Sequence, residues 1–303
     1  MRLGGPIWPG IAVLRGCRHS AILACIVDVV ISSIAIFPIK SLDGITISDA
    51  KLLPSGALEH DREFALCDDD GRWVNGKRDA RLHAIRSEYD LEKFTVKLNA
   101  PSQPEWQVFH LVEDQRELEK WFTDLLGIAV HLNRDQTSGF PDDSHAPGPT
   151  IISTGTIAAV SSWFSTLDQV EARRRLRANI ELSADSAFWE DQLFGPPNQE
   201  VSFLLGDVKM LGVKPCKRCV VAARNPITGE ETEDFQKAFS AKRLATLPSW
   251  VNRARFGPLF YRLAVNTRVP SSETGKCLSV GDRIQTSLAS RATTADSVAP
   301  TNS

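Results

Sequence analysis

The segment Lys214-Pro215-Cys216-Lys217-Arg218-Cys219 places two thiols three residues apart among three basic side chains. A thiolate is the soft ligand that redox-active metals prefer, and neighbouring positive charge lowers the pKa of a thiol. The spacing alone fits a metal ligand, a redox pair or two small buried residues. A structural zinc site needs four ligands, but the histidines are scattered at positions 19, 60, 83, 110, 131 and 145.

Two of these interpretations fit the pair poorly. A thioredoxin-type pair opens a helix, whereas residues 219–222 are expected to be extended because Val220 and Val221 are β-branched. Ordinary burial in a core is also disfavoured, since three cations beside the pair would be hard to desolvate. The segment therefore predicts a functional site that uses a thiol in a basic setting.

Two further segments place cations beside expected strands. Phe37-Pro-Ile-Lys-Ser41 puts an ammonium group and a hydroxyl after a strand, and a run of arginines ends a helix before residues 179–182. Favourable pairing with the helix C-terminus accounts for Arg173 and Arg174 but less well for Arg177, which borders the apolar strand. Lys40, Arg177 and the cysteine segment together could form a pocket for an anionic ligand, with arginine as a bidentate phosphate clamp.

Composition limits the classes of protein to consider. The chain has 303 residues, of which 42% are hydrophobic and 24% charged, and its net charge is −2. This balance is typical of a soluble globular protein and gives no electrostatic footprint for nucleic acid. The six cysteines are too sparse and irregular for a secreted disulfide framework, which favours a reducing compartment.

The N-terminus allows two interpretations. Residues 21–37 are apolar over about the length of a short membrane span, but Asp28 lies near the middle, where a charge is costly in lipid. Residues 29–39 are mostly β-branched and aliphatic, as a buried strand is. We expect a leader over residues 1–28 followed by the first strand, and a membrane anchor or cleaved signal is the less favoured alternative.

Residues 29–149 predict strands and one helix. A hairpin is expected over residues 64–67 and 72–75, around the turn Asp68-Asp-Asp-Gly71. Residues 94–98 alternate as a half-buried strand does. Residues 113–126 predict an amphipathic helix that Gly127 can end, followed by a strand over residues 129–132. The polar residues 133–149 are expected to form a loop between two parts of the chain.

The second part combines short strands with helices. Helices are expected over residues 156–164 and 167–176. Extended segments are expected over residues 150–153, 179–182, 201–205, 208–211, 219–222, 262–265 and 283–285. Many short strands with Gly and Pro between them predict a β-barrel or closed sheet with a few helices, a mainly β fold of the α+β class. Residues 287–303 are rich in Ser, Thr and Ala, and a disordered tail is expected there.

The order of several short motifs resembles a known family. Phe37-Pro-Ile-Lys-Ser41, His60-Asp-Arg-Glu-Phe64, Arg177-Ala-Asn-Ile180, Pro215-Cys-Lys-Arg-Cys219 and Asn225-Pro-Ile-Thr-Gly229 occur in the order and spacing of the MOSC proteins. These are the molybdenum-cofactor sulfurase C-terminal domain family. The chain is most similar to its stand-alone fungal and bacterial branch, which is related to the mitochondrial amidoxime-reducing component and the YcbX-type reductases. The resemblance implies a β-barrel N-domain over residues 29–133 and a MOSC domain, also a β-barrel, over residues 134–286.

The resemblance also implies a cofactor and the residues that bind it. Members bind molybdenum through the dithiolene of a pyranopterin with a terminal phosphate. By similarity Cys219 would be the metal ligand and the catalytic residue, and Cys216 a neighbour. Lys40 and Ser41 would meet the phosphate or the pterin edge, and the side chains that would complete the cofactor site are Arg62, Arg177 and Asn179.

The implied activity is a molybdenum-dependent oxidoreductase that reduces N-hydroxylated compounds. Electrons would come from a cytochrome b5-type protein with its NADH reductase, or from a flavin or iron–sulfur partner. No pyridoxal phosphate is expected. The alternative is a non-redox cofactor carrier or a sulfur relay that uses a cysteine persulfide. We expect the protein in the cytoplasm or in association with mitochondria. Asn225 replaces the aspartate usual in relatives, which is expected to alter hydrogen bonding around the site.

Overall fold

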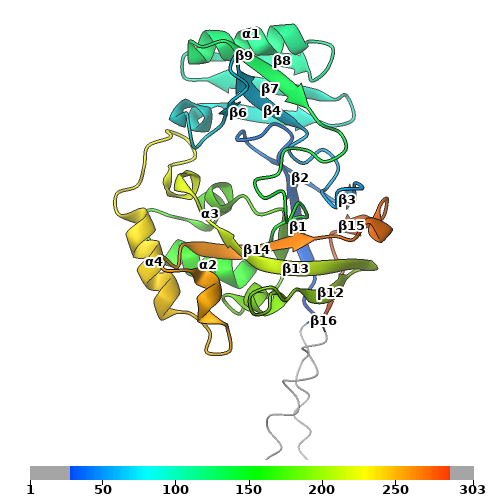
Figure 1. Ribbon diagram of the computed structural model, residues 1–303. Helices are drawn as coiled ribbons and strands as arrows, with labels where there is room; N and C mark the ends of the chain where they lie inside the picture. The colour runs from blue at the N-terminus through cyan, green and yellow to red at the C-terminus, as the bar shows by residue number, and fades with distance from the viewer. Residues whose placement is uncertain (1–27, 287–303) are drawn as a thin grey trace, which may run out of the picture.

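The computed structural model describes residues 28–286, and Figure 1 shows a smaller unit of strands and one helix above a larger one. The expected leader up to residue 27 and the expected tail lie outside the described residues. The α-helices of the described part are α1 (Gln115–Leu126), α2 (Thr154–Ser162), α3 (Gln169–Leu176) and α4 (Phe235–Ala245). Short 3-10 helices are η1 (Ala80–Ala84), η2 (Trp189–Leu193), η3 (Val220–Ala223), η4 (Arg253–Phe256) and η5 (Ser271–Glu273).

The strands are distributed over four sheets. The largest has eight strands in the order β16 (Ile284–Thr286), β12 (Val201–Leu205), β13 (Val208–Lys217), β14 (Arg262–Arg268), β10 (Ile151–Ser153), β11 (Ile180–Leu182), β1 (Ile31–Ile36) and β2 (Ile45–Ile47). The smaller sheets are β15 (Cys277–Ser279) with β3 (Asp49–Lys51); β5 (Trp73–Val74), β4 (Phe64–Asp68) and β9 (Val130–Arg134); and β6 (Arg86–Asp90), β7 (Thr95–Ala100) and β8 (Gln103–His110). The mainly β, α+β fold class is confirmed.

One pair of neighbouring strands in the large sheet is parallel. β10 runs parallel to β11, and α2 and α3 form the connection between them. Parallel neighbours need such a crossover because the chain must return to the same end of the sheet. This crossover ends at Arg177, so it delivers that residue to the edge of the apolar strand β11.

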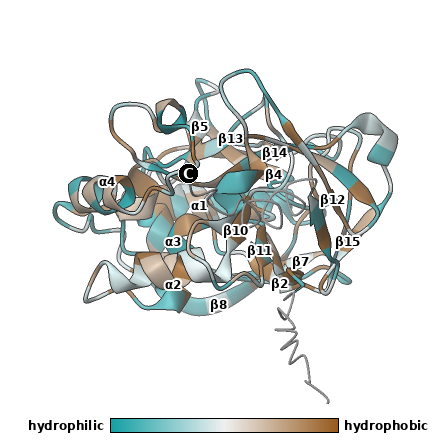
Figure 2. Ribbon diagram, turned by 90° about the horizontal axis from the view of Figure 1, so that it is seen from below, coloured by the Kyte–Doolittle hydropathy of each residue, from teal (hydrophilic) through white to brown (hydrophobic). Residues whose placement is uncertain are grey.

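The first strands pack with the second half of the chain. β1 pairs with both β11 and β2, and β3 pairs with β15 near the C-terminus. Ile31, Ile34 and Ile36 belong to the same hydrophobic core as Ile151 and Val265. Figure 2 shows the central strands, β10 and β11 among them, largely brown and the outer strand β8 largely teal. The division into domains near residue 133 stays a prediction, and residues 31–52 join the larger unit through these contacts.

The N-terminal unit has a separate core closed by α1. Leu118, Trp121, Phe122 and Leu126 are buried on one face of this helix, as the periodicity predicts. Gly127 ends the helix in the left-handed conformation with φ 62°, and its N–H donates to Thr123 O at 2.8 Å. Glycine is favoured there because it lacks the Cβ that penalises positive φ.

Strand β13 brings the cysteine segment to the surface of the sheet. Its register with β14 shifts between Pro215 and Lys217. Proline has no N–H for the ladder and is found in sheets mainly at edges or bulges, and a bulge changes where a side chain points. The irregularity at Cys216 therefore has a local cause in Pro215.

One sequence prediction about this segment is wrong. Residues 219–222 were expected to be extended, but Val220–Ala223 form the 3-10 helix η3, and Cys219 precedes it. Ala222 and Ala223 are buried against a cluster that includes Phe235 and Phe239 of α4. Their packing outweighs the β-propensity of Val220 and Val221, which are weak local signals.

Within residues 28–286 no helix is long and apolar enough to cross a bilayer. The four cysteines in that range, Cys67, Cys216, Cys219 and Cys277, are free thiols.

Candidate functional site

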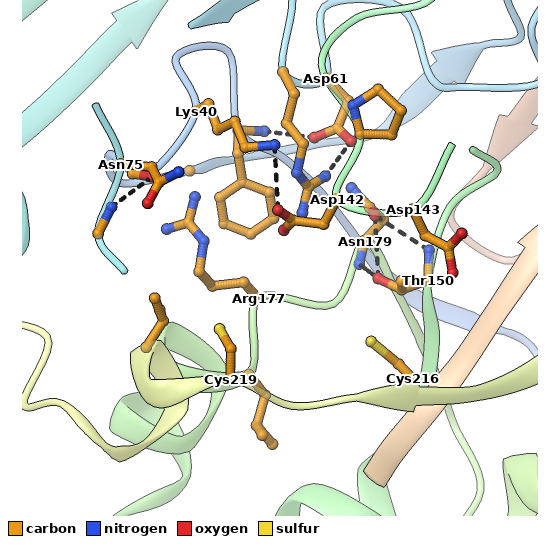
Figure 3. A pocket seen from close by; sticks show the side chains of 18 of the residues that line it. Lys40, Asp61, Asn75, Asp142, Asp143, Thr150, Arg177, Asn179, Cys216 and Cys219 are labelled. Atoms are coloured by element: carbon orange, nitrogen blue, oxygen red, sulfur yellow. Dashed lines mark hydrogen bonds and ion pairs between the residues drawn. The ribbon is translucent and has the colours of Figure 1, made fainter. Parts of the chain in front are cut away.

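All six predicted site residues line one cavity of about 660 Å³ between the two units: Lys40, Ser41, Arg62, Arg177, Asn179 and Cys219. Figure 3 shows Cys216 and Cys219 on one side, Lys40 and Asp61 on the other, and Arg177 between them. Residues as far apart in the chain as Lys40 and Cys219 thus meet at a single site.

Lys40 is held at the end of the first strand segment by the loop over residues 135–149. Its Nζ donates to Phe140 O at 2.8 Å and lies 3.2 Å from Asp142 Oδ1. Burial lowers the pKa of Lys40, against the opposing charge of Asp142. Burial alone would raise the pKa of Asp142, but the charges of Lys40, Arg62 and Lys77 hold it well below its ordinary value. Asp142 is therefore a carboxylate surrounded by three cations.

Arg62 follows the same pattern in a more buried position. It forms an ion pair with Asp61, and its guanidinium lies 5.2 Å from the centroid of the Phe37 ring. Burial would lower the pKa of Arg62, but Asp61 and Asp142 raise it. Its backbone has φ 54°, a left-handed conformation that is uncommon for a residue with a side chain. Gly139 packs closely against this turn. A Cβ at position 139 would lie only 2.7 Å from Asp61 O, so a residue without a side chain is needed there.

Arg177 also lies over the Phe37 ring and has no carboxylate partner among the described residues. Its guanidinium is 4.0 Å from the ring centroid, and Nη1 donates to Leu42 O at 2.7 Å. Burial and then the charge of Arg62 lower the pKa of Arg177 to about 10. Among the described residues no carboxylate forms an ion pair with it. A cation held in this way is suited to an anionic ligand.

Ser41 and Asn179 hold the frame of the cavity. The Ser41 hydroxyl accepts from Gly76 N at 3.0 Å. Asn179 Oδ1 accepts from Thr150 N and Thr150 Oγ1 at 3.2 and 3.1 Å, and its Nδ2 donates to Ala35 O at 3.1 Å. Asn179 thereby ties β1 to the start of β10. Their predicted contact with a cofactor stays a prediction.

The two cysteines differ in their surroundings. Cys216 Sγ accepts from Arg218 Nη1 at 3.4 Å. Within residues 28–286 the thiol of Cys219 makes no side-chain hydrogen bond, although both residues are partly exposed to the cavity. Cys219 also directly precedes η3, whose last two residues, Ala222 and Ala223, are buried. Among the described residues, the two thiols of the cavity thus differ in that an arginine donates to Cys216 and no side chain donates to Cys219.

Asn225 keeps the turn after η3 intact. Its Oδ1 accepts from Ile227 N at 2.8 Å and from Thr228 N at 3.1 Å. An amide oxygen serves this turn as a carboxylate oxygen would, because only an acceptor is needed. Asn225 does not line the cavity. The expected change in hydrogen bonding around the site therefore has no counterpart in these contacts.

Sequence reasoning missed several residues of the cavity. The loop predicted over residues 133–149 lines the cavity, but its acidic residues Asp142 and Asp143 were not predicted to belong to the site. Asp143 lies 2.7 Å from Lys214 Nζ. The adjacent pair of acidic residues in a chain segment rich in Pro and Gly was the available signal. No pattern in the sequence indicated which cations they face.

The charge of the cavity is strongly positive. Its lining includes twelve lysines and arginines and four aspartates. Each aspartate forms an ion pair with a lysine or arginine. Across residues 28–286 no group of three or more His, Cys, Asp or Glu side chains is placed to hold a metal ion. The cavity is therefore suited to an anionic ligand beside two free thiols, and a metal bound there would have to bring most of its own ligands.

Comparison with known proteins defines the class to which this two-unit β protein is related. Residues 28–130 match the family described as MOSC N-terminal beta barrel domain. This part of the chain is therefore similar to that domain, in agreement with the resemblance seen in its motifs.

The relatives found are mitochondrial amidoxime reducing components. The chain is 24% identical over 275 residues to mitochondrial amidoxime reducing component 2 of Macaca fascicularis, covering 76% of this chain and 77% of that protein. It is 23% identical over 240 residues to the protein of the same name from Bos taurus, covering 66% and 67%. Identity to the Homo sapiens protein is 24% over 234 residues, covering 66% and 68%. The chain is thus similar over most of its length to these mitochondrial components.

Proposed function

We propose that the protein is a molybdenum-cofactor oxidoreductase that reduces N-hydroxylated compounds with electrons from a partner protein. The observation that supports this most is Cys219, whose sulfur has no hydrogen bond among the described residues and faces a cavity with surplus cations. The names of the relatives describe reduction of amidoximes, which are N-hydroxylated compounds.

The donor set fits a pyranopterin-bound molybdenum. A dithiolene supplies the soft sulfur ligands that the described side chains do not, and Cys219 would add a thiolate. Lys40 and Arg62 would hold the terminal phosphate, while Arg177 and Ser41 would border the pterin. When bound, the cofactor supplies two-electron redox chemistry. Asn179 would position this site by fixing β1 against β10.

The remaining contribution of the chain is electrostatic. Lys217 and Arg218 lie between the cysteines and line the cavity, and neither forms an ion pair among the described residues. Positive charge beside Cys219 favours its thiolate form, which is the form that binds metal. The loop over residues 135–149 forms part of the cavity wall.

We further propose that electrons reach the site from a separate donor protein. A cytochrome b5-type protein with its reductase, or a flavin or iron–sulfur protein, would fill this role. The support is the word component in the names of the relatives, which fits one part of a multi-protein reductase. Reduction of the purified protein by such a donor, followed by turnover, is the measurement that checks it.

A second candidate is a sulfur relay or cofactor carrier. The observation that favours it is Cys216, a second free thiol in the same cavity whose sulfur lies 3.4 Å from Arg218 Nη1. A guanidinium at that distance would stabilise a thiolate or persulfide. This alternative predicts a persulfide on a cysteine and no reduction of N-hydroxylated substrates.

One assay separates the two. Protein expressed with cofactor supply is given benzamidoxime and reduced viologen, and the formation of benzamidine is measured. The proposed function predicts turnover that Cys219→Ser abolishes and Cys216→Ser, the same change three residues away, retains. Turnover that persists in Cys219→Ser contradicts the assigned ligand. A persulfide without turnover in the wild type supports the relay.

A further inference from the structure

A second group of cations lines the cavity away from the Lys40 and Arg62 pair. It consists of Arg86, Arg174 and Arg224, with His83 beside them, and all four residues line the cavity. Arg86 belongs to β6, Arg174 to α3, and Arg224 to the turn that follows η3. None of these positions belongs to the motifs that indicated a cofactor site.

Contacts between distant segments bring these side chains together. Arg86 Nη2 donates to Pro226 O at 2.7 Å, so β6 contacts the turn that holds Arg224. On the same turn a Cβ on Gly229 would stand 2.4 Å from Ala80 O, which leaves no space between the turn and η1. The turn after Cys219 is therefore fixed against residues 80–86 of the N-terminal unit.

These charges also act on a neighbouring imidazole. Burial lowers the pKa of His83, and the positive charges of Arg177, Arg224 and Arg86 lower it further. Burial also lowers the pKa of Arg86, against the opposing charge of Asp43, and Arg174 adds to the lowering. The cations of this group thus repel one another and a neighbouring His83.

The group has too little negative charge of its own. Arg86 has one ion pair, at 3.1 Å with Asp43. Across residues 28–286 neither Arg174 nor Arg224 forms an ion pair with a carboxylate, and Arg224 Nη1 donates only to Gly229 O at 2.9 Å. Three guanidinium groups around one carboxylate leave an excess of positive charge that an anion would offset.

We propose that Arg86, Arg174 and Arg224 form a second anion subsite that binds a carboxylate or phosphate group of the ligand in the cavity. Two sources supply that chemistry. One is an acidic group on the N-hydroxylated substrate, in which case the substrate class is an anionic one. The other is a second phosphate on a nucleotide-extended form of the cofactor. Only the first source rests on the proposed function.

The test uses a matched pair of ligands that differ in one charge. Benzamidine and 4-carboxybenzamidine, which do not undergo reduction, are titrated into the cofactor-loaded protein by calorimetry. A substrate subsite predicts that the carboxylated ligand binds about tenfold more tightly. Arg224→Met reduces this preference to about twofold or less, because a charge-assisted hydrogen bond is lost. Arg116→Met removes an exposed arginine on α1 outside the cavity and keeps the preference.

A salt titration and a replacement variant complete the test. The preference is expected to fall with added salt, as exposed charge pairs are screened. If Arg224→Met does not fold, Arg174→Met takes its place, since Arg174 is exposed on α3 and its loss leaves no buried gap.

The second source, a nucleotide-extended cofactor, is tested by mass spectrometry. Cofactor extracted from the wild type and from Arg224→Met is analysed for a nucleotide. A nucleotide-extended cofactor in the wild type that is depleted in the variant supports the subsite and assigns it to the cofactor. Equal binding of the two amidines together with a cofactor that has no nucleotide would overturn the proposal. A protein that prefers the carboxylated ligand but does not reduce benzamidoxime would keep the subsite and remove the proposed function.

Discussion

Arg177 tests whether the cavity is built for an anionic ligand or for the stability of the fold. Its guanidinium stacks on Phe37 without a carboxylate partner among the described residues, and burial and then the charge of Arg62 lower its pKa from the ordinary value to about 10. This shift corresponds to about 3 kcal/mol of destabilisation of the charged form before solvent screening. At neutral pH arginine is charged in the folded and unfolded states, so the folded protein bears this destabilisation.

The change Arg177→Met removes the charge and keeps most of the side-chain volume. It loses the hydrogen bond to Leu42 O, about 1 kcal/mol, and the cation–π contact with Phe37, also about 1 kcal/mol. The cofactor-free variant is therefore expected to gain about 1 kcal/mol, which raises Tm by about 2–4 °C. Its retention of cofactor is expected to fall at least about tenfold, because a cation that faces the ligand is gone.

The assay is thermal unfolding of cofactor-free protein, with cofactor content measured in parallel. Arg116→Met on the exposed face of α1 is the control and is expected to leave Tm within about 1 °C. A fall in Tm of several degrees in Arg177→Met, with cofactor retained, would refute the reasoning. Arg177 would then support the fold and not the ligand.

Three further predictions concern stability and anion binding. Burial and then the charge of Asp191 raise the pKa of Glu190 from 4.5 to about 7 in the folded state. Between these two values the folded protein holds a proton that the unfolded chain releases, so the free energy of unfolding falls as the pH rises from 4.5 to about 7. Glu190→Gln removes this fall, and its Tm relative to the wild type should increase from pH 5 to pH 8; a constant difference contradicts it. Gly212→Ala would place a Cβ 1.6 Å from Leu193 O, so β13 must shift. We expect Tm to drop by at least about 5 °C. A Tm within about 2 °C of the wild-type value would contradict this packing. Asp142→Asn frees Lys40 from its carboxylate, and cofactor-free protein should bind inorganic phosphate about fivefold more tightly by calorimetry; unchanged affinity contradicts the arrangement.

Local patterns predicted many of the elements and the residues of the site. The helix that ends at Gly127, the hairpin around residues 68–71 and the strands on either side of α2 and α3 follow from periodicity and turn residues that act over a few positions. The motif residues were expected to meet, and Lys40, Arg177 and Cys219 line one cavity. The basic character of each motif was visible locally, and the prediction of an anionic ligand rests on it.

Contacts between distant segments account for what the sequence did not reveal. Val220 and Val221 favour a strand, but the burial of Ala222 and Ala223 against α4 turns the chain into η3. Helix α4 itself was missed, as were the short strands β3 and β15, whose pairing joins residues more than 220 positions apart. The group of Arg86, Arg174 and Arg224 has no pattern in the sequence because three separate elements supply it.

The central claim is that Cys219 is the protein ligand of a molybdenum held by a pyranopterin. Protein expressed with cofactor supply is purified as the wild type and as Cys219→Ser, and molybdenum and pterin are quantified per chain. The account predicts about one molybdenum per chain in the wild type and a large loss in the variant, because a serine hydroxyl is a harder and weaker ligand than a thiolate. A wild type without molybdenum, or a variant that holds as much of it as the wild type, would contradict the claim.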